Sequence, residues 1–153
     1  GTLNIVGARP AMGKSAFALG MAVSAARTTN RPVLFFSLEM SATELTQRIL
    51  SAEAQVDSDR MRTGRLQDAD WTKITNAINR LEIPLYIDDT SQITVMQIRQ
   101  KLRRVAVADA PPALVVIELQ SQENYQVLID NMKSYNINYT ALNKNDNVFA
   151  YLV

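Results

Sequence analysis

The stretch GARPAMGKSAF, residues 7–17, separates a short apolar run from a long Ala-rich segment. A small residue, four variable residues and then Gly-Lys-Ser form the pattern of a phosphate-binding P-loop. In such a loop, backbone N–H groups and the N-terminus of the following helix point at phosphate oxygens. Lys14 would add a positive charge near the β- and γ-phosphates, and Ser15 would offer its hydroxyl to Mg²⁺. The stretch therefore predicts a strand, a loop that holds a nucleotide or phosphate, and a helix.

The loop departs from the strict pattern at its first position. That pattern begins with Gly, whereas this chain has Ala8, with Gly7 one residue earlier. We expect nucleotide contacts from the whole loop, which comprises Ala8, Arg9, Pro10, Ala11, Met12, Gly13, Lys14 and Ser15. The alternative is a tight strand-to-helix turn that contains Gly-Lys-Ser without binding a phosphate.

Composition narrows the class of protein. The 153 residues suit a single domain over 1–153, and 16 Lys and Arg against 15 Asp and Glu give a net charge of +1. This balance provides no general attraction to nucleic acid or to an anionic membrane. The absence of Cys and His excludes disulfides, thiol nucleophiles and His-based acid–base chemistry. No apolar run approaches the roughly 18 residues of a membrane span, and no charged leader precedes the first strand-like run, so we expect no membrane partner and a cytoplasmic location.

Outward from the loop, short apolar runs alternate with longer helical patterns. Ser41 with Glu44, and Thr94 with Gln97, have the spacing of capping boxes that open helices. Strands that alternate with helices imply right-handed crossovers and a mostly parallel sheet covered on both faces, a three-layer α/β fold. The expected strands lie at 2–6, 31–39, 83–90 and 113–119, and the expected helices at 14–28, 42–55, from 66–71 to about 81, and 94–108, with a helical turn or two at 58–63.

Several blocks of this sequence resemble the RecA-like motor domain of DnaB-type replicative helicases. The resemblance covers residues 1–117 and implies an ATP-driven DNA motor with a RecA-like sheet. It also implies that Glu39 is the catalytic glutamate that polarises the attacking water; the alternative for Glu39 is an acid placed favourably near a helix start. The blocks are GARPAMGKSAFAL, VLFFSLEMSATEL, QRILSAEAQVD, MRTGRLQDADW and PLYIDDT.

The next block of the family pattern differs. The family has an Mg²⁺-holding aspartate after its fourth strand, and this chain has Glu118 there. Because Mg²⁺ demands near-ideal ligand placement, the longer side chain predicts weakened metal binding. The resemblance then ends, and the sensing glutamine, the DNA-facing loops and the arginine finger have no match. We therefore expect ATP, ADP or phosphate and weakly held Mg²⁺ as ligands, at most a weak residual ATPase activity, no productive DNA binding and no helicase hexamer.

Residues 118–153 have a different character, a helix over 122–135 followed by strands at 138–143 and 147–153 that form an antiparallel hairpin. They are similar to the C-terminal end of the ACT-like regulatory domain of short-form threonine dehydratases. Two such halves that meet inside the strand 114–119 predict an engineered chimera. If they share one sheet, 138–143 should run parallel to 114–119. The alternative is that residues 118–153 merely finish a sheet.

Two functions remain open, a nucleotide-binding module with little or no turnover and a fold-design or evolution test protein without biochemical activity. For three other groups of residues we expect a structural role rather than a functional one. Lys101, Arg103 and Arg104 are expected on a solvated helix face, Asp88 and Asp89 in a strand-end turn without metal, and Trp71 and Met40 in the core.

Overall fold

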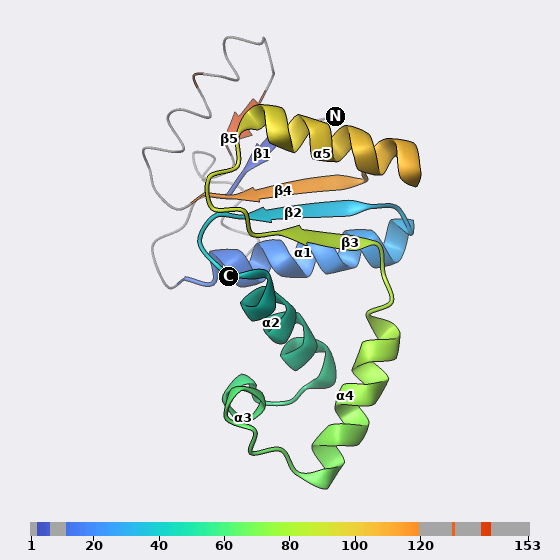
Figure 1. Ribbon diagram of the computed structural model, residues 1–153. Helices are drawn as coiled ribbons and strands as arrows, with labels where there is room; N and C mark the ends of the chain where they lie inside the picture. Colours follow the sequence, from blue (N-terminus) through green and yellow to red (C-terminus); the bar gives the residue numbers. More distant parts are fainter. Residues whose placement is uncertain (1–2, 7–11, 120–129, 131–138, 142–153) are drawn as a thin grey trace. The chain divides into compact units, whose positions relative to one another are not determined.

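The computed structural model describes residues 3–6, 12–119, 130 and 139–141 (Figure 1). The chain divides into two compact units. The terminal unit comprises Gly1–Phe17 and Leu119–Val153, and the central unit comprises Ala18–Glu118. No helix in the described part of the chain is long and apolar enough to cross a membrane.

The central unit is built on a parallel sheet whose strand order is β3-β2-β4. The strands are β2 (Val33–Ser37), β3 (Leu85–Asp88) and β4 (Leu114–Glu118). β2 is buried along its whole length, as its continuous apolar run predicts for a strand covered on both faces. In the register of the sheet, Ser37 lies opposite Glu118, so the two side chains end at the same edge.

Helices cover both faces of this sheet, and Figure 1 shows α1 and α5 on opposite sides of it. α1 (Lys14–Thr29) and α2 (Ala42–Ala54) pack on one face, and α5 (Val95–Ala108) covers the other. The three-layer α/β arrangement and its parallel sheet are therefore confirmed. The core of the first face consists of Leu19, Ala22, Ala26, Val33, Phe35 and Leu45.

A second, smaller core joins α2 to α3 (Ser58–Thr63) and α4 (Asp68–Arg80). Ala54, Val56, Ile74 and Ala77 form its buried part. Met40 packs against the main core as predicted. The prediction for Trp71 is wrong, because its side chain is 57% exposed: the buried face of α4 carries Ile74 and Ala77, and Trp71 lies off that face.

The terminal unit contains a parallel pair of short strands, β1 (Leu3–Ile5) and β5 (Tyr139–Ala141), with Leu3 opposite Tyr139. The predicted strand at 138–143 is thus present at 139–141. In the described part of the chain its partner is β1, and β4 belongs to the other sheet, so the condition for pairing with 114–119 is not met. The predicted helix at 122–135, apart from Asp130, and the hairpin strand at 147–153 lie outside the described residues.

Candidate functional site

The P-loop pattern lies in the local structure that it requires. β1 ends at Ile5 and α1 begins at Lys14, so the loop connects a strand to a helix N-terminus. Of the predicted contact residues, Met12, Gly13, Lys14 and Ser15 are described, whereas Ala8, Arg9, Pro10 and Ala11 lie outside the described residues. Met12 is 71% exposed.

Gly13 adopts a left-handed conformation with φ of 79° directly before α1. A Cβ built at this position would meet no atom of the described residues within 4 Å, and the left-handed conformation by itself accounts for the glycine. The N–H of Phe17 donates to the carbonyl oxygen of Gly13 at 2.9 Å and begins the helical ladder. The first N–H groups of a helix have no partner within that helix and carry the positive end of its dipole, which favours an anion.

Lys14 and Ser15 occupy the first two positions of α1, and both are half-buried. Lys14 therefore contributes a positively charged side chain from the first residue of the helix. A serine hydroxyl is an oxygen ligand of the kind that Mg²⁺ accepts. The end of this loop therefore suits a phosphate group in both charge and donor chemistry.

At the carboxyl edge of the central sheet, Glu118 ends β4 with its side chain buried, at 6% exposure. The hydroxyl of Ser37, which ends β2 and is 1% exposed, donates to Oε2 of Glu118 at 2.8 Å. A carboxylate is also an oxygen ligand suited to Mg²⁺, so Glu118 fits the predicted donor set in kind.

Glu39 lies two residues beyond the end of β2, in the turn Leu38–Met40, and its side chain is exposed. This turn is attached to the sheet at both ends. The N–H of Leu38 donates to the carbonyl oxygen of Glu118 at 3.3 Å, and the N–H of Met40 donates to Oγ of Ser37 at 3.0 Å. The sequence interpretation missed Ser37; a polar residue at the end of an otherwise apolar strand was the available signal.

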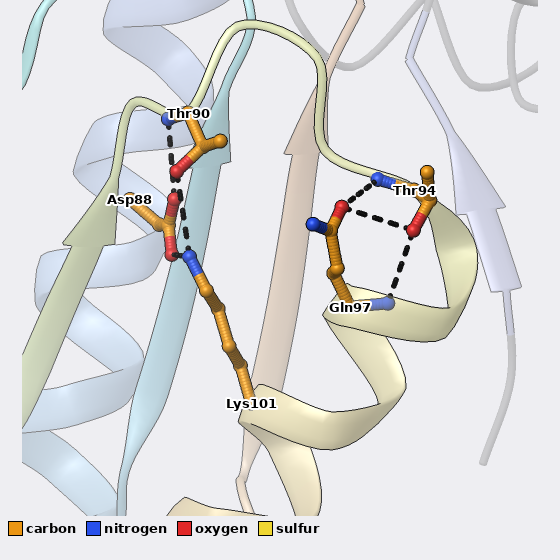
Figure 2. A network of polar contacts seen from close by, with 5 residues as sticks. All are labelled: Asp88, Thr90, Thr94, Gln97 and Lys101. Carbon is orange, nitrogen blue, oxygen red and sulfur yellow. Dashed lines mark hydrogen bonds and ion pairs between the residues drawn. The ribbon is translucent and has the colours of Figure 1, made fainter.

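Asp88 is the last residue of β3 (Figure 2), and Asp89 follows it directly. The N–H of Thr90 donates to Oδ1 of Asp88 at 3.1 Å, and the N–H of Ala42 donates to Oδ2 of Asp89 at 2.8 Å. In the described ranges, no group of three or more acidic, His or Cys side chains could hold a metal ion. The predicted turn is confirmed at Asp88, whereas the contact of Asp89 with the start of α2 was not predicted.

The basic cluster on α5 is only partly a solvated face. Arg103 and Arg104 are exposed, as predicted, but Lys101 reaches back to form an ion pair with Asp88 (Figure 2). Burial alone would raise the pKa of Asp88, but hydrogen bonds from Lys101 and Thr90 outweigh it and hold that pKa below its usual value. Lys101 thus connects α5 to the end of β3 through an ion pair. The pattern of charges along one helix does not reveal a contact with a distant strand.

The predicted site residues fall into both units. Gly13, Lys14 and Ser15 belong to the terminal unit, and Glu39 and Glu118 belong to the central unit. Each set has the local geometry described above, and their joint action on one nucleotide stays a prediction.

Comparison with known proteins identifies relatives of this chain. The profile of the DnaB-like helicase C-terminal domain family matches residues 1–138. The replicative DNA helicase DnaB of Nostoc is 47% identical over 118 residues, which are 76% of this chain and 13% of that helicase. DnaB of Geobacillus stearothermophilus is 44% identical over 132 residues, covering 81% of this chain and 29% of that helicase. The chain thus spans less than a third of the length of either relative.

Solved structures agree with the fold. A DnaB-like replicative helicase, solved in a study of its interactions with primase, matches 92% of this chain and 38% of its own with a TM-score of 0.73 and 22% identity. A solved ATPase domain matches 92% of this chain and 56% of its own with a TM-score of 0.75 and 23% identity. The central sheet, the strand–loop–helix at Gly13 and the profile match over residues 1–138 lead to one conclusion: the chain belongs to the family of DnaB-like helicase C-terminal domains.

Proposed function

We propose that this chain is a nucleotide-binding module that holds ATP, ADP or phosphate at its P-loop with little or no hydrolysis. The observation that supports it best is the left-handed Gly13 immediately before the helix that begins with Lys14 and Ser15. This combination presents helix N–H groups, a cation and a hydroxyl at one place. It depends on β1, the loop and α1, and not on the helicase motifs that have no match in this sequence.

In this proposal the loop from Ala8 to Ser15 surrounds the phosphates, and Lys14 neutralises part of their charge. Ser15 and Glu118 would hold Mg²⁺, which when bound offsets the charge of the phosphate oxygens. Glu39 would orient the attacking water, a role that its exposed position beyond β2 allows. Exposure leaves its carboxylate accessible to solvent and therefore to a water molecule.

We propose slow turnover because hydrolysis depends on positioning and charge stabilisation, and the arginine finger that would supply part of that stabilisation has no match in this sequence. Glu118 extends further than the aspartate of the family pattern, and its Oε2 accepts a hydrogen bond from Ser37. We also propose that the 153-residue chain alone neither unwinds DNA nor assembles as the helicase hexamer. The cytoplasm is the proposed compartment, because the matching relatives are named as replicative DNA helicases.

The test is equilibrium binding of a fluorescent ADP analogue, with and without Mg²⁺, to the chain and to two charge-matched variants. Lys14→Ala removes the proposed phosphate ligand, whereas Lys73→Ala removes an exposed lysine on α4. We expect Lys14→Ala to weaken binding at least tenfold, as loss of a charge-assisted contact worth about 1.5–3 kcal/mol implies, and Lys73→Ala to leave it unchanged. Equal affinity in the two variants would overturn the proposal.

The chimeric origin of residues 118–153 is a further part of the proposal. It is supported by the helix-strand-strand pattern shared with the ACT-like regulatory domain of threonine dehydratases and by the strand β5 within that segment. The family profile also matches the first part of this segment, to residue 138. A junction inside the strand 114–119 therefore has to account for a helicase match that continues to residue 138. If no nucleotide or phosphate binds at all, the alternative of a fold-design or evolution test protein without activity is favoured.

A further inference from the structure

One buried hydroxyl connects the end of β4 to the turn that carries Glu39. The N–H of Met40 donates to Oγ of Ser37 at 3.0 Å, and the hydroxyl of Ser37 donates to Oε2 of Glu118 at 2.8 Å. The N–H of Leu38 also donates to the carbonyl oxygen of Glu118. Both ends of the turn are thus hydrogen-bonded, directly or through Ser37, to a residue 81 positions away from Ser37 in the sequence.

The chemistry of the groups fixes the direction of this chain of hydrogen bonds. A serine hydroxyl has one proton to donate and two lone pairs that accept. An amide N–H only donates, so Ser37 must accept from Met40 and is left to give its proton to the carboxylate. Orientation of the Ser37 lone pair toward Met40 therefore depends on an acceptor at position 118.

Burial makes this arrangement restrictive. Ser37 is 1% exposed and Glu118 is 6% exposed, so water does not readily replace either partner. A buried polar group that loses its partner is strongly disfavoured, which keeps the hydroxyl in one orientation. Glu39, between the two anchored positions, is itself exposed. The anchors hold its backbone while its side chain stays accessible.

We propose that Ser37 is a positioning residue that transmits the placement of the Glu118 carboxylate to Glu39. The proposal rests on the proposed function, in which Glu39 orients the attacking water. When the Glu118 carboxylate shifts away from Ser37, the hydroxyl is free to rotate, the bond from Met40 weakens, and the turn carrying Glu39 loosens. Glu118 and Glu39 are then coupled through one hydroxyl rather than acting independently.

The absence of Cys makes the position of Glu39 directly measurable, because Glu39→Cys creates the only thiol for a spin label. A label at the exposed Gln47 on α2, introduced as Gln47→Cys, is the matched control. We expect Ser37→Ala to increase the mobility of the label at position 39 in electron paramagnetic resonance spectra and to leave position 47 unchanged. Ser37→Thr, which retains the hydroxyl, should restore the original spectrum.

Amide hydrogen exchange gives an independent measure in the unlabelled chain. Ser37→Ala should accelerate exchange of the Met40 N–H about tenfold relative to the amides of Val33 and Phe35 in β2. Asp89→Ala, which removes the acceptor for the N–H of Ala42, should accelerate Ala42 and spare Met40. Equal acceleration of Val33, Phe35 and Met40 in Ser37→Ala, or an unchanged Met40, would overturn the proposal.

Failure of this inference is distinguishable from failure of the proposed function. Lys14→Ala should weaken binding of the ADP analogue at least tenfold while leaving Met40 exchange unchanged. Unaltered binding in Lys14→Ala would reject the nucleotide site alone. An immobile label at position 39 in Ser37→Ala would reject the coupling alone.

Discussion

Two Gly→Ala substitutions at one helix should change stability in opposite directions. Gly13 precedes α1 in a left-handed conformation with φ of 79°, and Gly20 lies within α1 and is exposed. Within the part of the chain that the structure describes, a Cβ at either position would meet no atom within 4 Å. Steric crowding is therefore the same for both, and only the backbone conformation distinguishes them.

The magnitudes follow from conformational preferences. A left-handed conformation costs a non-glycine residue roughly 1–2 kcal/mol, of which about 0.4–1 kcal/mol is offset because Ala restricts the unfolded chain. Gly13→Ala should therefore destabilise the chain by about 0.5–1 kcal/mol. In a helix interior, Ala is favoured over Gly by about 0.8–1.0 kcal/mol, so Gly20→Ala should stabilise it. The two variants should differ by about 1.3–2 kcal/mol, or roughly 3–8 °C in melting temperature for a chain of this size.

Urea denaturation followed by far-UV circular dichroism measures both free energies of unfolding. The affinity for a fluorescent ADP analogue, measured on the same samples, should fall in Gly13→Ala and stay constant in Gly20→Ala. If both variants shifted in the same direction by the same amount, the left-handed conformation of Gly13 could not be the reason for its glycine. An unchanged affinity in a destabilised Gly13→Ala would separate the helix start from phosphate binding.

Two further perturbations test other parts of the chain. Hydrogen bonds from Arg27 and Arg80 lower the pKa of Glu53, so the stability that they contribute is present above the unfolded pKa of about 4.5 and is lost as the pH falls through the folded pKa. In urea denaturation, Glu53→Gln should be about 1 kcal/mol less stable than the parent near pH 7 and equal to the parent at a pH below the folded pKa. The exposed control Glu82→Gln should match the parent near pH 7. Deletion of residues 138–153 removes β5, the strand that pairs with β1 in the terminal unit, and should lower the melting temperature of the chain; a truncated chain with native circular dichroism and melting temperature would show that this strand pair does not contribute to stability.

Local signals in the sequence predicted the helices and strands well because each acts within a few residues. Ser41 accepts from the N–H of Glu44 at 3.2 Å, and α2 begins at the next residue. Thr94 and Gln97 form the reciprocal capping box before α5 (Figure 2). Such bonds satisfy helix N-terminal donors, and their residue types and spacing are visible in the sequence. The same holds for the start of α1 after Gly13.

Contacts between distant segments were not predictable in the same way. Ser37 meets Glu118 because β2 and β4 pair in a register that places both at one edge, and no pattern near residue 37 specifies that register. Lys101 was assigned to solvent from its neighbours on α5, but the end of β3 brings Asp88 within its reach. Trp71 was assigned to the core from helical spacing, which groups residues on a face without indicating which face is covered.

Glu118 illustrates how the two kinds of information combine at the site. Measured against the family pattern, a glutamate in place of an aspartate is predicted to weaken metal binding. Within this fold, the longer side chain ends with Oε2 at 2.8 Å from the hydroxyl of a serine that is 1% exposed. An aspartate is one methylene shorter, so we expect it to reach that hydroxyl less well. We therefore expect the glutamate to stabilise the turn that carries Glu39, and a measurement of metal affinity in Glu118→Asp needs a parallel measurement of that turn, because the substitution is expected to change both.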